Sequence, residues 1–379
     1  MKKAFKFLFV TLLIVLTLSV VASATEKGKR CGENVTWTLE SGTLRISGTG
    51  AMDDYSSSTY PSWLLKSSNI KRIVVEEGVT YIGDYAFWQL EYVESVLLPS
   101  SLTSVGIYSF SFMGSLQFLE LPINLKEIGN FAFERAGITY IKLPDGLTSI
   151  GRQAFRSTNL ESIVIPKGVK VIRDWTFGDS YMLKNVILPK GLTTIEAGAF
   201  AGTDLKSIII PESVTSIANN SFQFDRYAHT PDFIIRGFEG SYAQQYARNS
   251  NFVFQLLTEI IMTIDSTDAA INGKAVETDV APIIENDRTM LPARFVAENL
   301  GATVSWDAET RTATIKSDDV EIKIIVDSAV AYVNGNEVKL DSPAFIRNDR
   351  TYTPVRFIAE TLGATVEWDG AARQATITK

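Results

Sequence analysis

The stretch from residue 141 to residue 155 reads Ile-Lys-Leu-Pro-Asp-Gly-Leu-Thr-Ser-Ile-Gly-Arg-Gln-Ala-Phe. In it an apolar-x-apolar triplet leads into a proline, two apolar residues follow three positions apart, and a small residue precedes a phenylalanine. Between Arg72 and Phe222 this pattern occurs seven times, at a spacing of 22 or 23 residues. Glu76 takes the place of proline in the first copy, and the others have Pro99, Pro122, Pro144, Pro166, Pro189 and Pro211. A fixed period of this length is typical of a solenoid, in which each repeat forms one coil.

The columns of the repeat predict which residues form strands and which form the core. Each triplet is expected to be a short strand that ends at the proline, because proline has no N–H to donate to a ladder. Three columns are expected to stack from coil to coil in the interior, since no coil can bury its apolar face alone. The first column is Val79, Leu102, Leu125, Leu147, Val169, Leu192 and Val214; the second is Ile82, Val105, Ile128, Ile150, Ile172, Ile195 and Ile217; the third is Phe87, Phe110, Phe133, Phe155, Phe177, Phe200 and Phe222.

A glycine follows the second column in the first four repeats only. It is present as Gly83, Gly106, Gly129 and Gly151, and then replaced by Arg173, Glu196 and Ala218. We interpret it as a left-handed backbone position that is either not required in the last three repeats or strained there.

Atypical segments on both sides of the repeats are expected to cap the open ends of the solenoid. In residues 31–70, two alternating segments flank Glu40-Ser-Gly42 and predict a hairpin. Residues 233–254 break the pattern, and Ser241 there is a plausible N-cap for a helix. This solenoid, with its Cys-Gly-Glu-Asn-Val-Thr-Trp opening and its Gly-Ser-Tyr-Ala closing segment, resembles the BspA-type leucine-rich repeats of bacterial surface proteins over about residues 31–254. The resemblance implies a role in adhesion to matrix proteins, other cells or polymers.

A second repeat, offset by 62 residues, begins after Thr258. Its two units, about residues 265–316 and 327–378, predict a small α+β domain with internal duplication. In each unit Asn-Gly favours a tight hairpin turn, Asn-Asp-Arg-Thr favours another turn, and a proline and a glycine bound a short helix. The matching segments are Asn272-Gly273 with Asn334-Gly335, Asn286–Thr289 with Asn348–Thr351, Pro292–Glu298 with Pro354–Glu360, Leu300–Val304 with Leu362–Val366, and Trp306-Asp307 with Trp368-Asp369.

These segments resemble the copper amine oxidase N-terminal-like domain over about residues 260–379. The resemblance implies a stalk or a surface-association module, because the copper and quinone of that enzyme family belong to a separate catalytic domain. The fold class expected for the whole chain is therefore mainly β: a solenoid with end caps in residues 25–256 and a small α+β domain in residues 257–379.

Residues 1–24 predict an export signal that precedes the solenoid. Three lysines come first, an apolar stretch from Phe7 to Val21 follows, and Ala22-Ser23-Ala24 fits a cleavage site. The alternative is an uncleaved membrane anchor. Cleavage removes three basic residues and no acid, which leaves 33 basic and 43 acidic side chains and a net charge of −10. We therefore expect a secreted protein at the extracellular cell surface, with no transmembrane segment in the mature chain and no nucleic acid as a partner.

Few residues are candidates for chemistry. The only histidine, His229, lies in a polar loop, and the only cysteine, Cys31, is either a buried thiol or a crosslink between chains. Asp53-Asp54 lacks the spacing of a calcium loop. Asp287-Arg288 and Asp349-Arg350 are interpreted as turn hydrogen bonding, and Arg294/Glu298 and Arg356/Glu360 as helical surface pairs. We expect no enzyme activity, no catalytic residue, no cofactor and no metal.

One set of residues points to binding. Strand positions that face away from the core form a row with apolar, aromatic and charged members, in which Phe118 and Tyr140 lie beside the Glu120/Lys142 pair. The alternative is β-propensity on a sheet covered by loops. The candidate binding surface is Phe118, Glu120, Tyr140, Lys142, Val164, Ile187 and Ile209.

These residues predict a surface protein whose solenoid binds a protein or polymer partner at the cell surface or in the matrix. The C-terminal domain then serves as a stalk or a wall-association module. The alternative is a carbohydrate- or cell-wall-binding accessory protein whose affinity lies in the C-terminal domain.

Overall fold

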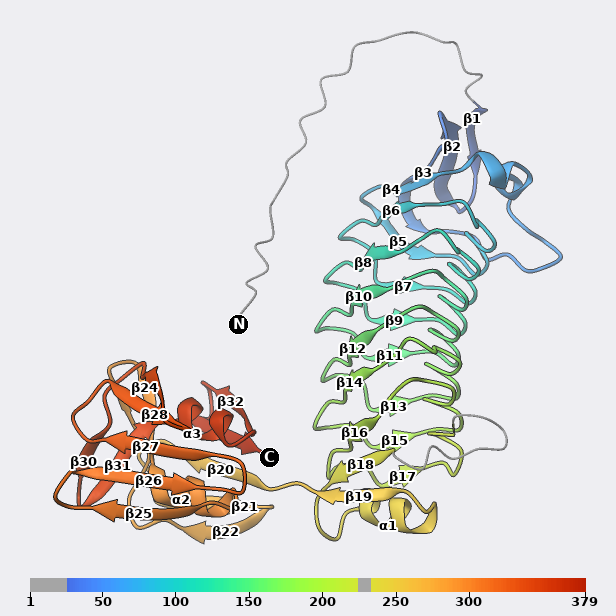
Figure 1. Ribbon diagram of the computed structural model, residues 1–379. Helices are drawn as coiled ribbons and strands as arrows, with labels where there is room; N and C mark the ends of the chain where they lie inside the picture. The colour runs from blue at the N-terminus through green and yellow to red at the C-terminus, as the bar shows by residue number, and fades with distance from the viewer. Residues whose placement is uncertain (1–25, 224–232) are drawn as a thin grey trace.

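The structure is a computed structural model that describes residues 26–223 and 233–379, in which the seven repeats form the coils of a solenoid (Figure 1). Each coil contributes one strand to each of two rows of parallel strands, which we call ladders; backbone pairing is interrupted at places along both rows. The first ladder contains β4 (Arg72–Val75), β6 (Ser95–Leu97), β8 (Phe118–Glu120), β10 (Tyr140–Lys142), β12 (Ser162–Val164), β14 (Asn185–Ile187) and β16 (Ser207–Ile209). The second contains β5 (Val79–Ile82), β7 (Ser104–Val105), β9 (Glu127–Ile128), β11 (Ser149–Ile150), β13 (Val171–Ile172), β15 (Thr194–Ile195) and β17 (Ser216–Ile217).

The three predicted columns form the core of the solenoid. Their members are all buried, and the phenylalanines are 0–1% exposed. From Phe110 to Phe222 the rings are stacked, with centroids 5.3–5.6 Å apart. Burial of a phenylalanine stabilises the fold by about 1.5–3 kcal/mol, so this column is a large share of the coil–coil interfaces.

The glycine column has a different role from the one expected. Gly83, Gly106, Gly129 and Gly151 do not have positive φ angles; the left-handed residues lie two positions later and are mostly not glycine, as at Tyr85 with φ 55°. A Cβ atom on Gly129 would lie 2.6 Å from the carbonyl carbon of Gly106. These glycines therefore permit the close approach of one coil to the next, and the left-handed interpretation was wrong.

The N-terminal end of the solenoid is covered by β1 (Glu26–Arg30), β2 (Asn34–Glu40), β3 (Thr43–Ala51) and the 3₁₀ helix η1 (Ser62–Asn69). The predicted hairpin is confirmed: β2 and β3 are antiparallel and turn at Ser41 and Gly42, which both have positive φ angles. Strand β3 also pairs in parallel with β4 and β5, so it starts both ladders. The indole ring of Trp63 lies 6.4 Å from the first phenylalanine ring of the column, at Phe87, and covers it.

At the other end, β18 (Ile234–Gly237) and β19 (Val253–Leu256) continue the first ladder in parallel. Between them lies α1 (Tyr242–Asn249), which begins after the predicted N-cap Ser241; the Ser241 hydroxyl accepts a hydrogen bond from the Gln244 amide. Tyr246 of this helix packs against Phe222, with ring centroids 6.0 Å apart. In the part of the chain that the structure describes, no helix has the length and apolar character needed to cross a membrane.

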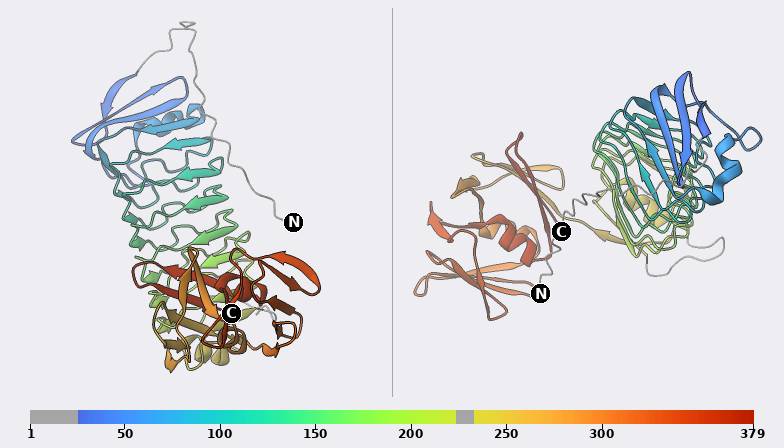
Figure 2. Two further views of the ribbon diagram at one scale, coloured as in Figure 1. Left: turned by 90° about the vertical axis from the view of Figure 1, so that its left-hand side faces the viewer. Right: turned by 90° about the horizontal axis from the view of Figure 1, so that it is seen from above.

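The C-terminal domain consists of two five-stranded sheets, a four-stranded sheet and two helices that lie between the larger sheets (Figure 2). Its first repeat forms β20 (Glu259–Thr263), β21 (Asp268–Ile271), β22 (Lys274–Glu277), β23 (Ile283–Glu285), β24 (Arg288–Pro292), α2 (Ala293–Asn299), β25 (Thr303–Asp307) and β26 (Thr312–Lys316). Its second forms β27 (Glu321–Ile325), β28 (Val330–Val333), β29 (Asn336–Lys339), β30 (Phe345–Arg347), β31 (Arg350–Pro354), α3 (Val355–Thr361), β32 (Thr365–Asp369) and β33 (Gln374–Thr378).

The two repeats exchange strands. One large sheet has the order β22-β21-β20-β33-β32 and the other β25-β26-β27-β28-β29, so each contains strands of both repeats. The four-stranded sheet, β23-β24-β31-β30, joins the repeats around a pseudo-twofold axis at the Leu291–Thr353 pair. Gly301 and Gly363 end the helices with φ angles of 85° and 82°, as predicted, and Pro292 and Pro354 lie one position before the first helical residue.

Candidate functional site

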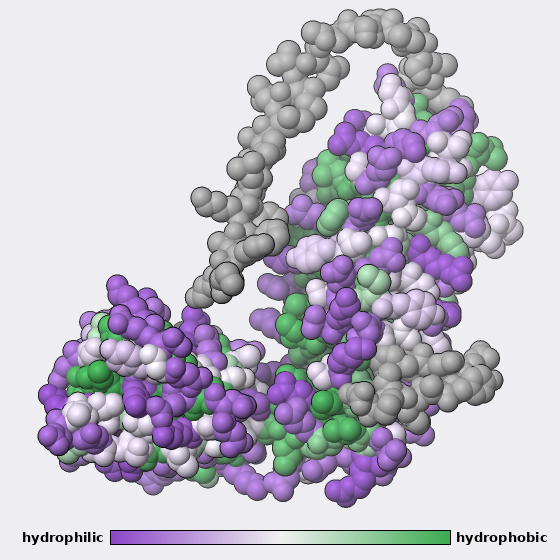
Figure 3. All heavy atoms as spheres, viewed as in Figure 1, coloured by the Kyte–Doolittle hydropathy of each residue, from purple (hydrophilic) through white to green (hydrophobic). Residues whose placement is uncertain are grey.

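The outward residues of the first ladder form a continuous row along the solenoid. We call it the outer strip. It is made of the seven candidate residues and one more apolar neighbour: Leu97, Phe118, Glu120, Tyr140, Lys142, Val164, Ile187 and Ile209. All eight are exposed, including Phe118 at 64% and Tyr140 at 56%, so loops do not cover this face. Hydrophobic residues are visible along the side of the solenoid that carries β12, β14 and β16 (Figure 3).

The centre of the outer strip combines aromatic and charged side chains on neighbouring coils. Phe118 lies directly opposite Tyr140 in the parallel register, and Glu120 lies opposite Lys142. A shallow cavity of about 250 Å³ opens beside them and is lined in part by Tyr140, Lys142 and Val164. This geometry offers an apolar and aromatic contact area with a hydrogen-bond donor and an acceptor beside it.

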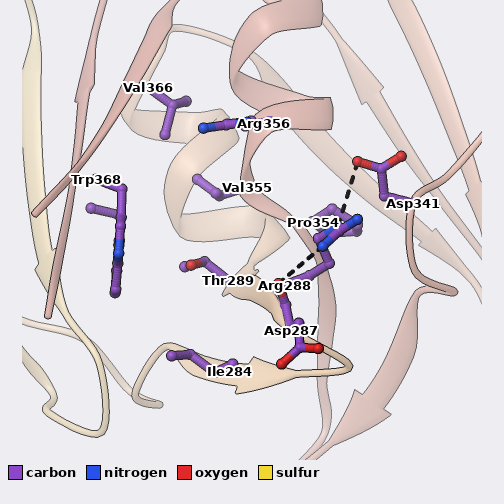
Figure 4. A pocket seen from close by; sticks show the side chains of 11 residues that line it. Ile284, Asp287, Arg288, Thr289, Asp341, Pro354, Val355, Arg356, Val366 and Trp368 are labelled. Carbon is purple, nitrogen blue, oxygen red and sulfur yellow. Dashed lines mark hydrogen bonds and ion pairs between the residues drawn. The ribbon is translucent and has the colours of Figure 1, made fainter. Parts of the chain in front are cut away.

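Two cavities in the C-terminal domain are built from equivalent residues of its two repeats, and we call them the twin pockets. The larger, about 510 Å³, lies between the turn that joins β23 to β24 and the start of α3, with β32 and β33 behind (Figure 4). The smaller, about 280 Å³, lies between the turn that joins β30 to β31 and the start of α2, with β25 and β26 behind. Each pocket therefore combines the turn of one repeat with the helix of the other.

A tryptophan forms one wall of each twin pocket. Trp368 lines the larger and Trp306 the smaller, and these two indoles are 42% and 40% exposed. No other tryptophan of the chain is as exposed, and Trp37 and Trp63 are buried. In the sequence, Trp306 and Trp368 serve only to align the two repeats, and they were not among the candidate site residues. The signal for them is a large aromatic side chain that recurs where the core pattern does not need one.

The aspartate after each tryptophan belongs to a turn and not to the pocket. The Asp307 carboxylate accepts hydrogen bonds from the Glu309 and Thr310 amides, at 2.9 and 3.2 Å. Hydrogen bonding, first from the Thr310 side chain and then from these amides, lowers the Asp307 pKa. The Asp369 carboxylate likewise accepts hydrogen bonds from the Ala371 and Ala372 amides.

The polar rim of each pocket comes from the Asn-Asp-Arg-Thr turns. Arg288 donates to the Asp287 carbonyl at 3.1 Å and Arg350 to the Asp349 carbonyl at 3.0 Å, which is the local turn hydrogen bonding that the sequence predicts. Arg288 also lies 3.6 Å from the Asp341 carboxylate. The side-chain carboxylates of Asp287 and Asp349 have no hydrogen-bond or ion-pair partner within residues 26–223 and 233–379, so both are available to a ligand.

An arginine at the start of each helix completes the rim. The expected helical pair is confirmed for Arg294 and Glu298, which lie 3.8 Å apart. Among the described residues Arg356 has no such contact with Glu360, and its side chain extends beside the larger pocket (Figure 4). In the larger pocket the charges of Arg288 and Arg356 are balanced by those of Asp287 and Asp341.

The remaining candidate residues from the sequence have structural roles or lie outside the residues that the structure describes. Asp54 accepts hydrogen bonds from the Tyr81 hydroxyl and the Asp84 amide, both at 2.9 Å, and so holds the N-terminal cap to the first coil. Cys31 is fully buried, and burial, with a smaller effect of Asp53, raises the pKa of its thiol to about 12. His229 and the predicted export signal lie outside the described residues.

Comparison with known families finds a match for each half of the chain. The profile of the BspA type Leucine rich repeat region matches residues 58–134 and 107–227 in six copies, and that of the Copper amine oxidase N-terminal domain matches residues 256–314 and 270–377. The chain joins a BspA-type leucine-rich repeat region to a copper amine oxidase N-terminal domain. Both resemblances seen in the sequence are confirmed. Neither family describes a catalytic domain.

Solved structures similar to the BspA-type region are bacterial leucine-rich repeat proteins. One from Eubacterium ventriosum is 23% identical, with 55% of this chain and 72% of that chain covered and a TM-score of 0.35. One from Bacteroides ovatus is 23% identical, with coverage of 59% and 66% and a TM-score of 0.39. A leucine rich cell surface protein from Faecalibacterium prausnitzii is 24% identical, with coverage of 55% and 54% and a TM-score of 0.34. No curated protein matches the sequence.

The residues of the copper amine oxidase N-terminal domain do not fit a copper centre. Copper is bound in proteins mainly by imidazole and sulfur ligands, and residues 256–377 contain no histidine and no cysteine. Within the described ranges there is also no group of three or more His, Cys, Asp and Glu side chains that could hold a metal ion. The match to this family therefore does not imply a copper site in residues 256–377.

Proposed function

We propose that this is a non-enzymatic protein of the bacterial cell surface whose BspA-type solenoid binds a protein partner through the outer strip. The observation that carries the proposal is the row of exposed side chains along the solenoid, apolar except for Glu120 and Lys142, on strands that lie beside one another from coil to coil. Such a row forms a flat, preorganised surface, and binding to it orders few side chains. The predicted export signal and the BspA-type family support a location outside the cell.

The centre of the outer strip is expected to contribute most of the affinity. Aromatic residues are enriched among the few interface positions that dominate binding, and Phe118 and Tyr140 lie on adjacent coils with their rings exposed. Lys142 and Glu120 at the same site can pair with charges of the partner and fix its orientation.

Variants of the exposed aromatic pair test this proposal. The chain without residues 1–24, and its Phe118→Ser, Tyr140→Ser double variant, are titrated against immobilised collagen, laminin and fibronectin and against whole bacterial cells. We expect saturable binding of the unmodified chain to at least one of these surfaces and a loss of about tenfold or more in affinity for the double variant.

Tyr181→Ser is the matched control, because Tyr181 is 68% exposed but is not in a strand of the first ladder. It should bind like the unmodified chain. The proposal is wrong if the unmodified chain binds none of these surfaces, or if the double variant binds as well as the control.

The C-terminal domain is proposed to associate with the cell wall and so hold the solenoid at the cell surface. The twin pockets favour this role over that of a passive stalk, since a stalk needs no exposed tryptophan beside unengaged polar groups. Sedimentation of the chain with purified bacterial cell walls tests it, and a chain that stays in the supernatant contradicts it.

A further inference from the structure

We infer that the twin pockets are two equivalent binding sites for a neutral polysaccharide, with one pyranose ring stacked on Trp368 and one on Trp306. This inference rests on the wall-association role proposed for the C-terminal domain and gives it a site and a ligand class. It is independent of the outer strip.

The first argument is that the exposure of the two tryptophans lowers the stability of the domain. An indole that is 40% or more exposed forgoes much of the stabilisation that burial gives. The hairpins β25–β26 and β32–β33 do not require the indole, because Asp307 and Asp369 hold their turns through hydrogen bonds to backbone amides. No structural role in the described fold therefore accounts for the exposed faces of these two rings.

The second argument is the repetition of the pocket lining when the two repeats are compared. Exposed positions away from the pocket walls are partly different, as at Lys274 and Asn336, and partly the same, as at Arg311 and Arg373. The residues that line the pockets are nearly the same in both repeats. The repeated positions are Ile284 and Ile346, Asp287 and Asp349, Arg288 and Arg350, Thr289 and Thr351, Arg356 and Arg294, and Trp368 and Trp306.

The chemistry of the lining selects the ligand. The face of an indole ring is electron-rich and attracts groups with a slight positive charge, such as the axial C–H bonds of a pyranose ring. Around Trp368 the free carboxylate of Asp287 can accept hydrogen bonds from sugar hydroxyls, and Arg356 can donate to them. An apolar wall with a few convergent donors and acceptors is the usual form of a small-molecule site.

The balance of charge disfavours a strongly ionic ligand. Two arginines and two aspartates line the larger pocket, so neither a phosphate nor a cationic group gains net attraction there. Arg294, Arg350 and Asp349 line the smaller pocket, and its two arginines are paired with Glu298 and Asp279. Two such pockets on one domain suit a polymer that presents the same unit many times, since simultaneous binding to both sites raises the overall affinity.

Calorimetric titration tests the inference with two neutral probes, the β-1,4-linked hexasaccharides of glucose and of N-acetylglucosamine. The protein is the chain without residues 1–24, as the unmodified form and as Trp306→Ala, Trp368→Ala and the double variant. We expect at least one probe to bind at two sites on the unmodified chain, at one site on each single variant, and at none on the double variant. A Trp306→Phe, Trp368→Phe chain keeps aromatic faces and should retain binding with an affinity lower by less than about tenfold.

Thermal unfolding of each variant is the fold control, because loss of an exposed indole should leave the transition unchanged. Absence of binding by both hexasaccharides overturns the inference, and so does equal binding by the unmodified chain and the alanine double variant.

Sedimentation with cell walls separates the two proposals. If the unmodified chain and the double variant sediment equally, wall association stands and the twin pockets are not its site. If the unmodified chain does not sediment, wall association fails, and the titration still decides the ligand of the pockets.

Discussion

At the scale of single residues, the environment of a side chain decides its chemistry more than its type does. Cys31 is the only thiol of the chain and follows a polar stretch, yet it is fully buried beneath the N-terminal cap. Its amide donates a hydrogen bond to the Val35 carbonyl at 2.9 Å, and its carbonyl accepts one from the Asp53 amide at 2.7 Å. The thiol thus belongs to the core and not to a surface that could form a crosslink.

The thiol of Cys31 should be unreactive in the folded protein. With a pKa of about 12, its thiolate fraction at pH 8 is on the order of a thousandfold below that of an exposed cysteine. Alkylation by iodoacetamide should therefore be slow in buffer and fast in urea, with mass spectrometry as the readout and Cys31→Ser as the unlabelled control. Because the folded-state pKa is raised, Cys31 favours folding below its unfolded pKa, and this contribution is lost as the pH rises towards 12. Rapid labelling of the folded chain, or a disulfide-linked dimer, would contradict this account.

At the scale of elements, the solenoid is stabilised by contacts between like residues of adjacent coils. Strand register aligns each residue with its equivalent 22 or 23 positions away, as at Ile141 and Leu119. Each phenylalanine inside the core column therefore stacks between two others, and its loss weakens two interfaces at once. The sequence predicts this column fully, because the residues that touch are set by the period of the repeat.

Phe155→Ala should lower the free energy of unfolding by about 3–5 kcal/mol, since it leaves a cavity between Phe133 and Phe177. Urea denaturation followed by circular dichroism measures the change. Phe118→Ala is the matched control, because Phe118 is exposed on the outer strip and its loss should cost less than about 0.5 kcal/mol. Equal effects of the two substitutions would show that the column is not the main source of stability.

At the scale of the whole molecule, the two halves are linked at a short join and have separate cores. Strand β19 ends at Leu256, the buried Leu257 donates to the Gly237 carbonyl, and β20 begins at Glu259. Lys190 of the solenoid lies 3.3 Å from the carboxylates of both Glu259 and Glu367. Lys190 is well exposed, so each of these pairs contributes only about 0–1 kcal/mol.

The strand exchange in the C-terminal domain makes its two repeats dependent on each other. A chain that ends after Lys316 lacks β33, the partner of β20, and β27, the partner of β26. We expect residues 257–316 of this shortened chain to be unfolded while the solenoid stays intact. Hydrogen exchange by mass spectrometry checks this, with the full-length chain as control. Slow exchange of β20 and β26 in the shortened chain would mean that one repeat folds alone.

The sequence by itself determined the features that depend on a short period. Seven copies of one pattern predict the coils, the strands and the buried columns, and the 62-residue repeat predicts the hairpin turns and the helix ends, because each of these follows from neighbours in the chain or from stacking of identical positions. The outward direction of Phe118 and Tyr140 could be predicted in the same way from the alternation of a strand.

Only the tertiary structure decided which segments meet across the repeats. The role of Gly129 depends on how closely one coil approaches another, and the sheet partner of β20 is β33, more than a hundred residues away. The twin pockets arise from the same exchange, since the Asp287 turn of one repeat faces Trp368 of the other. Local patterns cannot specify such contacts, because a strand of given polarity can pair with any complementary edge, and the choice is made by the packing of the whole domain.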